Sequence, residues 1–190
     1  MTSGEIYRPF GLLPLFFFVL HTLSNWPDGG WPHMLWMCII GNLLIALGIL
    51  LRLPLPIRIG VSWLILGLGL WLWFWVLKVG TSLPSVLAHV GGLVVGLVAL
   101  SKVRADRNTW LYASLWFLAV QQLCRVFTPA DLNVNIAHRV YDGLEVLFTT
   151  YGGFWLATTI LAALGLWLIG LGLQKLWPPG STPTTSAVNV

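Results

Sequence analysis

Four histidines are the residues of this sequence whose chemistry is most unusual in an apolar chain. His89 lies in LAHVGGLVVGL (87–97), a glycine-rich apolar run, and the others are His21, His33 and His138. Imidazoles from different helices can bind a haem iron axially or hold a metal or pigment. One hypothesis is therefore a cofactor site in which His89, with His21 or His33, binds haem or a chlorophyll-like pigment. The alternative is a packed imidazole whose polar atoms find hydrogen bonds inside the fold.

The glycines beside His89 favour the packing alternative. Gly92 and Gly96 form a GxxxG step, and Gly91 widens the same small-residue surface. Glycines at this spacing let a second helix approach closely. Because Gly92 and Gly96 follow His89 by three and seven residues, one helix face carries all three. We expect His89, Gly91, Gly92 and Gly96 to contact a neighbouring helix.

A second candidate site lies near residue 140. His138 and Asp142 stand four residues apart, so in a helix their side chains are neighbours and could hold a metal ion. Arg139 and Asp142 stand three apart, which would also make them neighbours. The competing hypothesis is a solvated charge pair at the membrane surface.

The residues AHVGG (88–92), with Gly96, resemble the histidine-bearing helix of rhomboid intramembrane proteases. That resemblance implies a serine nucleophile in a GxSG motif on an earlier helix, with the histidine as its base. No GxSG occurs in the chain, and Ser85 lies only four residues before His89 on the same segment. We therefore expect no catalytic residues and no enzyme activity.

Composition decides the class of protein that must position these residues. The chain is 57% hydrophobic and 8% charged, against about 25% charged in soluble domains. Its mean hydropathy is +0.85. Apolar runs recur along its whole length, which predicts an all-α, polytopic membrane bundle forming a single domain over 1–176. The six predicted spans are 9–24, 32–52, 59–78, 83–101, 109–127 and 149–173.

The basic residues predict the orientation of these spans. With the N-terminus inside, seven of the ten Lys and Arg residues fall on the inner side and three on the outer side. Cytoplasmic loops carry the excess of positive charge, so both termini are expected in the cytoplasm. All four histidines then fall toward the outer half. The seven inner residues are Arg8, Arg52, Arg58, Lys102, Arg104, Arg107 and Lys175.

Two segments are predicted to lie outside the spans. In 131–148, Leu132, Ile136, Val140 and Leu147 recur near helical spacing with polar residues between them, which predicts an interfacial amphipathic helix. The polar, Pro/Thr-rich segment 177–190 is expected to be disordered.

Residues 31–126 resemble the N-terminal membrane domain of bacterial transglutaminase-like membrane proteins. The resemblance rests on GTSL (80–83) before an apolar run, on KVRADRN (102–108) before the next, and on the LP-rich break at 53–56. It implies a scaffold, because the catalytic residues of that family lie in a soluble domain after the membrane part.

The sequence thus predicts a multi-pass protein of the bacterial inner (plasma) membrane that contacts lipid and no nucleic acid. Many small and aromatic packing residues beside few polar ones favour an accessory, non-catalytic subunit of a larger membrane complex. The alternatives are a protein that binds haem or a chlorophyll-like pigment through its outer histidines, and a transporter of a small solute.

Overall fold

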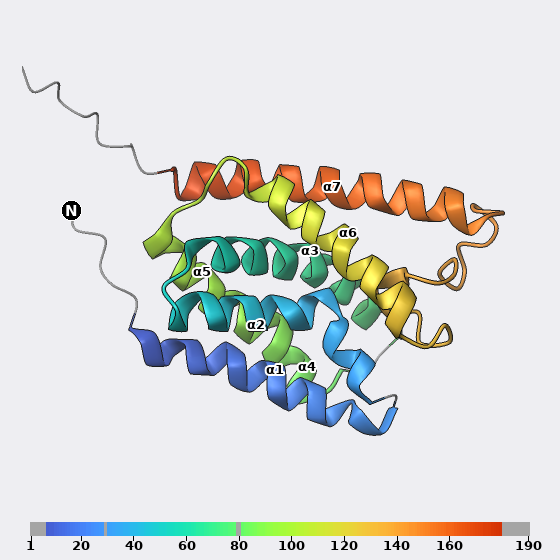
Figure 1. Cartoon of the computed structure of the whole chain (residues 1–190), viewed down its shortest axis with the longest axis horizontal. Coiled ribbons are helices and arrows are strands. Elements are labelled where there is room, and N and C mark those ends of the chain that lie inside the picture. Colours follow the sequence, from blue (N-terminus) through green and yellow to red (C-terminus); the bar gives the residue numbers. More distant parts are fainter. Residues whose placement is uncertain (1–6, 29, 79–80, 180–190) are drawn as a thin grey trace, which may run out of the picture.

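The chain folds into helices joined by short connections and one long loop. A computed structural model describes residues 7–28, 30–78 and 81–179, with no strand among them (Figure 1). The all-α prediction is confirmed. The α-helices are α1 (Leu12–Ser24), α2 (Met37–Leu50), α3 (Pro54–Lys78), α4 (Leu83–Val86), α5 (Gly92–Val103), α6 (Thr109–Phe127) and α7 (Tyr151–Leu176). The 3-10 turns are η1 (Arg8–Gly11), η2 (Trp26–Asp28), η3 (Trp31–Leu35) and η5 (Val134–Ile136), and η4 (Leu87–Gly91) is a π-helix that joins α4 to α5.

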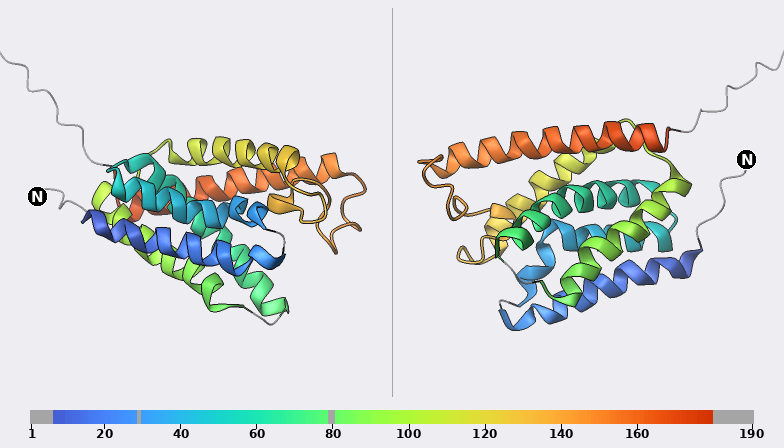
Figure 2. Two further views of the ribbon diagram at one scale, coloured as in Figure 1. Left: turned by 60° about the horizontal axis from the view of Figure 1, so that its bottom comes forward. Right: turned by 180° about the vertical axis from the view of Figure 1, so that it is seen from behind.

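Successive long helices run in opposite directions, so the bundle has two distinct ends (Figures 1 and 2). We call the end where α1 begins and α7 finishes the basic end, because the connections there carry Arg52, Arg104 and Arg107. The opposite end holds the turns after α1 and the long loop between α6 and α7. We call it the histidine end, because His21 and His33 lie there.

Three stretches are long and apolar enough to cross a membrane, judged by length and composition. They are Pro54–Trp73 in α3, Leu83–Val103 formed by α4, η4 and α5, and Tyr151–Leu176. Two shorter apolar helices, Arg8–Ser24 and Met37–Leu50, lie beside them. Each of the six predicted ranges contains a helix. Among the described residues, the three stretches from α3, from α4 to α5 and from α7 meet the length and hydropathy expected of a membrane span.

Prolines and the basic breaks explain where the helices begin. The pyrrolidine ring of Pro54 suits the first turn of a helix, where a missing N–H is not needed, and α3 begins at that residue. Before it, Arg52 adopts a left-handed conformation with φ of 59°. The predicted span 32–52 is interrupted, because η3 ends at Leu35 and the extended Trp36 separates it from α2.

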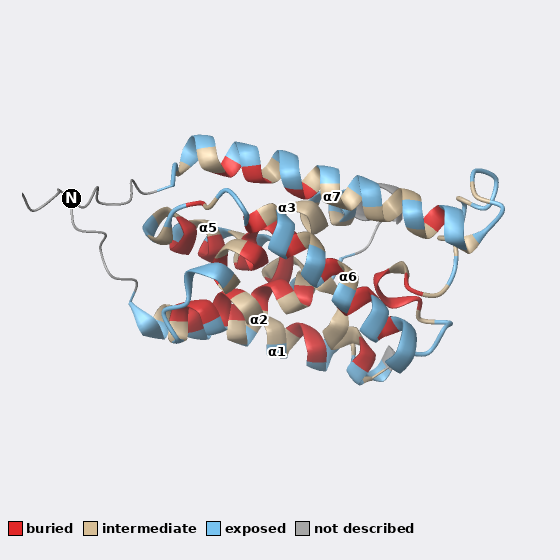
Figure 3. Ribbon diagram, turned by 45° about the horizontal axis from the view of Figure 1, so that its top comes forward, coloured by how far each residue is buried: buried red, intermediate tan, exposed pale blue. Residues whose placement is uncertain are grey.

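The core is built around α3, which is buried on two sides. Val61 and Leu64 belong to a cluster shared with α2, α5 and the end of α7. Ile59 and Trp63 belong to another cluster, shared with α6, α7 and the long loop. In contrast, α7 lies along one side of the bundle and is largely exposed (Figure 3).

The prediction of an amphipathic helix over 131–148 is wrong. The segment is an irregular loop with one 3-10 turn, and Asn133, Asn135 and Ile136 have positive φ. The side-chain oxygen of Asn133 accepts hydrogen bonds from the backbone N–H groups of His138 and Arg139. Asparagine side chains compete in this way with helical backbone bonding, which the apolar spacing alone did not reveal.

Asn135 attaches this loop to the bundle. Its Oδ1 accepts from the N–H of Met37 at 3.1 Å and its Nδ2 donates to the carbonyl of Leu35 at 2.7 Å, so it joins the loop to the start of α2. Gln121 of α6, only 1% exposed, donates to the Asn135 carbonyl and accepts from Trp155 of α7. A buried polar network therefore closes the histidine end.

The predicted disordered segment 177–190 lies largely outside the described residues. Its first residue is ordered, since the Trp177 carbonyl accepts from the N–H of Ala105 at 3.0 Å and its side chain packs against the α3 cluster.

Candidate functional site

Three of the four histidines come together at the histidine end. His21 lies in α1, His33 in η3 and His89 in η4. The ring centroids of His21 and His89 are 6.4 Å apart with an angle of 69° between the rings. The turn η3, which carries His33, packs against α1, which carries His21. His138 stays in the long loop, where its Nε2 lies 3.2 Å from the hydroxyl of Thr128.

His89 is held by its own helix and by α3. Its Nδ1 lies 2.8 Å from the carbonyl of Ser85, an acceptor, so Nδ1 carries the hydrogen and donates it. Trp71 of α3 stacks on the imidazole with centroids 5.1 Å apart and an interplanar angle of 16°. The Trp71 indole also donates to the hydroxyl of Ser85 at 3.0 Å. These contacts fix the ring and leave Nε2 with a lone pair.

The helix is underwound into a wider π turn at the position of His89. Such turns are rare, and they occur often at functional sites. Here the turn is tied to α2 by Asn42, whose Nδ2 donates to the carbonyl of Ala88 at 2.9 Å and to that of Cys38 at 3.0 Å. Asn42 is 0% exposed. Sequence reasoning missed this residue, although a single asparagine within MCIIGNLLIALGIL (37–50) was a visible signal.

The predicted packing glycines lie where three helices approach this segment. A Cβ atom on Gly92 would lie 2.0 Å from the Asn42 side-chain oxygen of α2, and one on Gly91 would lie 3.0 Å from Phe17 of α1. A Cβ atom on Gly96 would lie 2.7 Å from Val61 of α3 and 2.8 Å from Ile45 of α2. Real Cβ atoms essentially never come as close as those at Gly92 and Gly96 would, and the one at Gly91 would be tight, so the close approach depends on glycine at positions 92 and 96.

The other two histidines have unequal hydrogen bonding. His21 Nδ1 lies 3.2 Å from the amide nitrogen of Asn25, which also donates to the His21 carbonyl at 2.8 Å. His33 Nε2 is buried and has no hydrogen-bond partner in the described part of the chain. Buried polar atoms are rarely left unpaired, so this nitrogen is the least satisfied group of the cluster.

A haem or pigment fits this arrangement poorly. Trp71 already covers one face of the His89 ring, and His21 lies against it on another side. Both imidazoles are buried in contact with protein. A planar macrocycle bound to either ring would have to displace α1 or Trp71.

The second predicted site, a metal site at His138 and Asp142, assumed a helical segment, and the structure has an irregular loop there. Because the segment is not helical, the spacing of four residues no longer makes His138 and Asp142 neighbours. Asp142 instead pairs with Arg139 at 2.5 Å, with side chains 66% and 51% exposed. Among the described residues, no three His, Cys, Asp or Glu side chains are grouped so that they could hold a metal ion.

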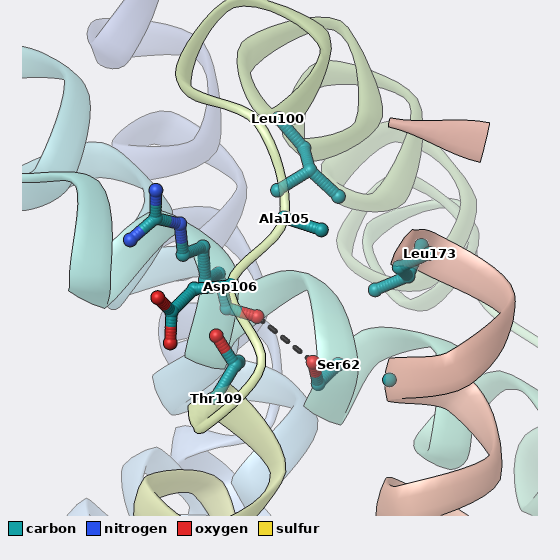
Figure 4. A pocket seen from close by; sticks show the side chains of 8 residues that line it. Ser62, Leu100, Ala105, Asp106, Thr109 and Leu173 are labelled. Atoms are coloured by element: carbon teal, nitrogen blue, oxygen red, sulfur yellow. Dashed lines mark hydrogen bonds between the residues drawn. The ribbon is translucent and has the colours of Figure 1, made fainter. Parts of the chain in front are cut away.

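A small pocket lies at the basic end, and charged residues on its wall stabilise the fold (Figure 4). It has room for no more than about one water molecule. Arg58, on its wall, donates from Nε to the Arg104 carbonyl at 2.8 Å and from Nη2 to the Val103 carbonyl at 2.9 Å. These carbonyls end α5 and otherwise lack helical partners. Asp106 accepts from the N–H of Asn108, so the charged groups stabilise the turn between α5 and α6.

Comparison with known proteins adds no relative. No family model matches the chain, and no curated protein and no solved structure matches it. The resemblance of 31–126 to transglutaminase-like membrane proteins stays a prediction.

The contact between Gly92 and Asn42 makes a direct prediction. Gly92→Ala should lower the free energy of unfolding by about 1–3 kcal/mol, because the added methyl overlaps the Asn42 side chain. Gly172→Ala in α7 is the matched control, since a Cβ there meets nothing within 4 Å. It should leave stability unchanged or raise it slightly, because alanine has the higher helix propensity. Chemical unfolding in mild detergent measures both, and equal effects of the two changes would contradict the close approach.

Proposed function

We propose that this chain is a six-span integral membrane protein that acts as a non-catalytic subunit of a larger membrane assembly. The observation that carries the proposal is the unequal burial of its most apolar helices. In α7, 17% of the residues in the apolar window are buried, against 39% in each of the windows from α3 and from α4 to α5. A helix that contributes so little to its own core presents its surface to lipid or to another subunit.

The surface of α7 suits a neighbouring helix. Gly152 and Gly172 each have open space where a Cβ would stand, so another backbone can approach at either position, on opposite faces of α7. Small residues at a helix surface are typical of helix association in membranes, where apolar side chains alone provide no preference for protein over lipid. Large exposed side chains lie between these glycines, namely Leu156, Ile160, Leu161, Leu164, Leu168 and Leu171.

The hydrogen bonds around His89 support a structural role in place of catalysis. The Ser85 hydroxyl accepts from Trp71, and His89 Nδ1 donates to the backbone carbonyl of Ser85. A serine nucleophile would need its hydroxyl to donate to the imidazole. The contacts of Ser85 and His89 are those of a packed helix turn.

A partner bound along α7 should be lost when its open glycine is filled. We expect the wild-type chain, purified from its native membrane in mild detergent, to co-elute with other membrane proteins above the mass of a lone 21.0 kDa chain. Gly172→Leu should release them while the chain stays folded. Gly69→Leu, on the exposed surface of α3 and equally free of contacts, should retain them. Elution of the wild-type chain alone would contradict the proposal.

The orientation follows from the charge at the basic end, which we place in the cytoplasm of a bacterial inner membrane with both termini. Single cysteines at Asp28 and Asp142 should react with a membrane-impermeant thiol reagent added outside intact cells, and one at Arg104 should not. The opposite labelling pattern would reverse the topology.

A further inference from the structure

We propose that the basic end of the bundle binds the head group of an anionic phospholipid, with the acyl chains of the lipid beside the exposed leucines between α2 and α3. The site goes beyond the proposed subunit function, because it takes a lipid and needs no protein partner. It rests on exposed cations that four chain segments bring together and on the apolar side chains that flank them. These cations, which we call the basic surface, are Arg8, Arg52, Lys102, Arg104, Arg107 and Lys175.

Contacts between the four segments gather these cations at one end of the molecule (Figures 1 and 2). A Cβ atom on Gly11 would lie 2.9 Å from the Leu50 side chain, so η1 packs beside the end of α2. Arg58, near the start of α3, donates two hydrogen bonds to the carbonyls that end α5. The N–H of Ala105 donates to the carbonyl of Trp177 at 3.0 Å, which brings the end of α7 to the connection between α5 and α6.

Little negative charge opposes the basic surface. Asp106 is the only acidic side chain at this end in the part of the chain that the structure describes, and it is half-buried. Its carboxylate accepts from the N–H of Asn108 at 2.9 Å, and it lines the small pocket together with Arg58. The exposed cations therefore create a positive potential that attracts phosphate groups. Arginine can in addition bind a phosphate through two parallel N–H groups.

Exposed apolar side chains lie directly beside the cations, and they favour a lipid over an acidic soluble protein. Leu51 and Leu53, 60% and 47% exposed, flank Arg52 in the connection between α2 and α3. Leu176, 68% exposed, follows Lys175 at the end of α7. Long basic side chains at helix ends extend toward the head groups while their apolar neighbours stay among the acyl chains. An acidic soluble protein would contact the cations and leave these leucines in water.

The grouping of the cations gives the surface a selectivity that a count of charges does not predict. The rule for membrane orientation concerns how many basic residues lie on each side, whereas here four segments bring theirs to one surface. Each Lys or Arg near an anionic membrane surface strengthens binding about fivefold. The basic surface should therefore select an anionic phospholipid over a zwitterionic one.

Native mass spectrometry of the purified, delipidated full-length chain in mild detergent measures lipid binding. We expect phosphatidylglycerol to bind at least about tenfold more tightly than phosphatidylcholine, and raised salt to weaken only the former. Arg52→Gln, and the double change Lys102→Gln with Arg107→Gln, should lower the affinity for phosphatidylglycerol about fivefold for each charge removed. Arg139→Gln is the matched control and should bind like the wild type, because it removes a cation that is 51% exposed at the histidine end.

Leu51→Ser tests the apolar part of the site and should weaken phosphatidylglycerol binding about threefold. Neither polyglutamate nor inorganic phosphate, at equal charge, should displace the lipid. Displacement by either probe would make the surface a site for acidic protein or free phosphate and would overturn the lipid site. Equal affinity for the two lipids, an equal loss in Arg139→Gln and Arg52→Gln, or unchanged binding in Leu51→Ser would also overturn it. None of these outcomes bears on the subunit proposal, which is tested by co-elution.

Discussion

The hydrogen bond from Asn42 to the carbonyl of Ala88 is the interaction on which the arrangement of this bundle depends. A π turn leaves backbone groups without their regular helical partners, and in a membrane no water can satisfy them. The amide of Asn42 reaches from α2 to satisfy one of these groups at 2.9 Å. The same contact brings α2 so close that a Cβ atom at position 92 would overlap the Asn42 side chain. This single contact therefore supports the π turn, the close approach of α2 and the orientation of His89.

At the two ends of the bundle, hydrogen bonds within the protein also satisfy buried polar groups, although His33 Nε2 and the Thr109 hydroxyl have no partner among the described residues. At the histidine end, Asn135 and Gln121 connect the long loop to α2, α6 and α7. At the basic end, Arg58 satisfies the last carbonyls of α5. Between these ends the contacts are mainly apolar, around α3. Most ionisable side chains lie near the ends, which agrees with the high cost of charge inside a membrane.

The helices were predictable because each is an apolar run bounded by prolines, glycines or basic residues. The range 109–127 coincides with α6, and α7 lies within three residues of its predicted bounds. The sequence also indicated that the histidines share one side. Their actual grouping was not predictable, because it depends on the rotation of α1, η3 and η4 relative to each other. The role of Asn42 was missed because a side-chain bond over 46 residues leaves no local pattern. The long loop was predicted as a helix because apolar spacing was given more weight than the asparagines that bend its backbone.

Hydrogen exchange of the backbone amides in Asn42→Leu tests most directly whether this contact holds the bundle together. Leucine keeps the branched shape of asparagine and removes the bond to Ala88, so the amides of residues 87–95 should exchange about tenfold faster than in the wild type, the change expected from losing one hydrogen bond of about 1.4 kcal/mol. The amides of α7, which lies on another side of α3, should keep their wild-type rates. Wild-type protection over 87–95 in the variant would contradict the account, because the π turn would then be stable without Asn42.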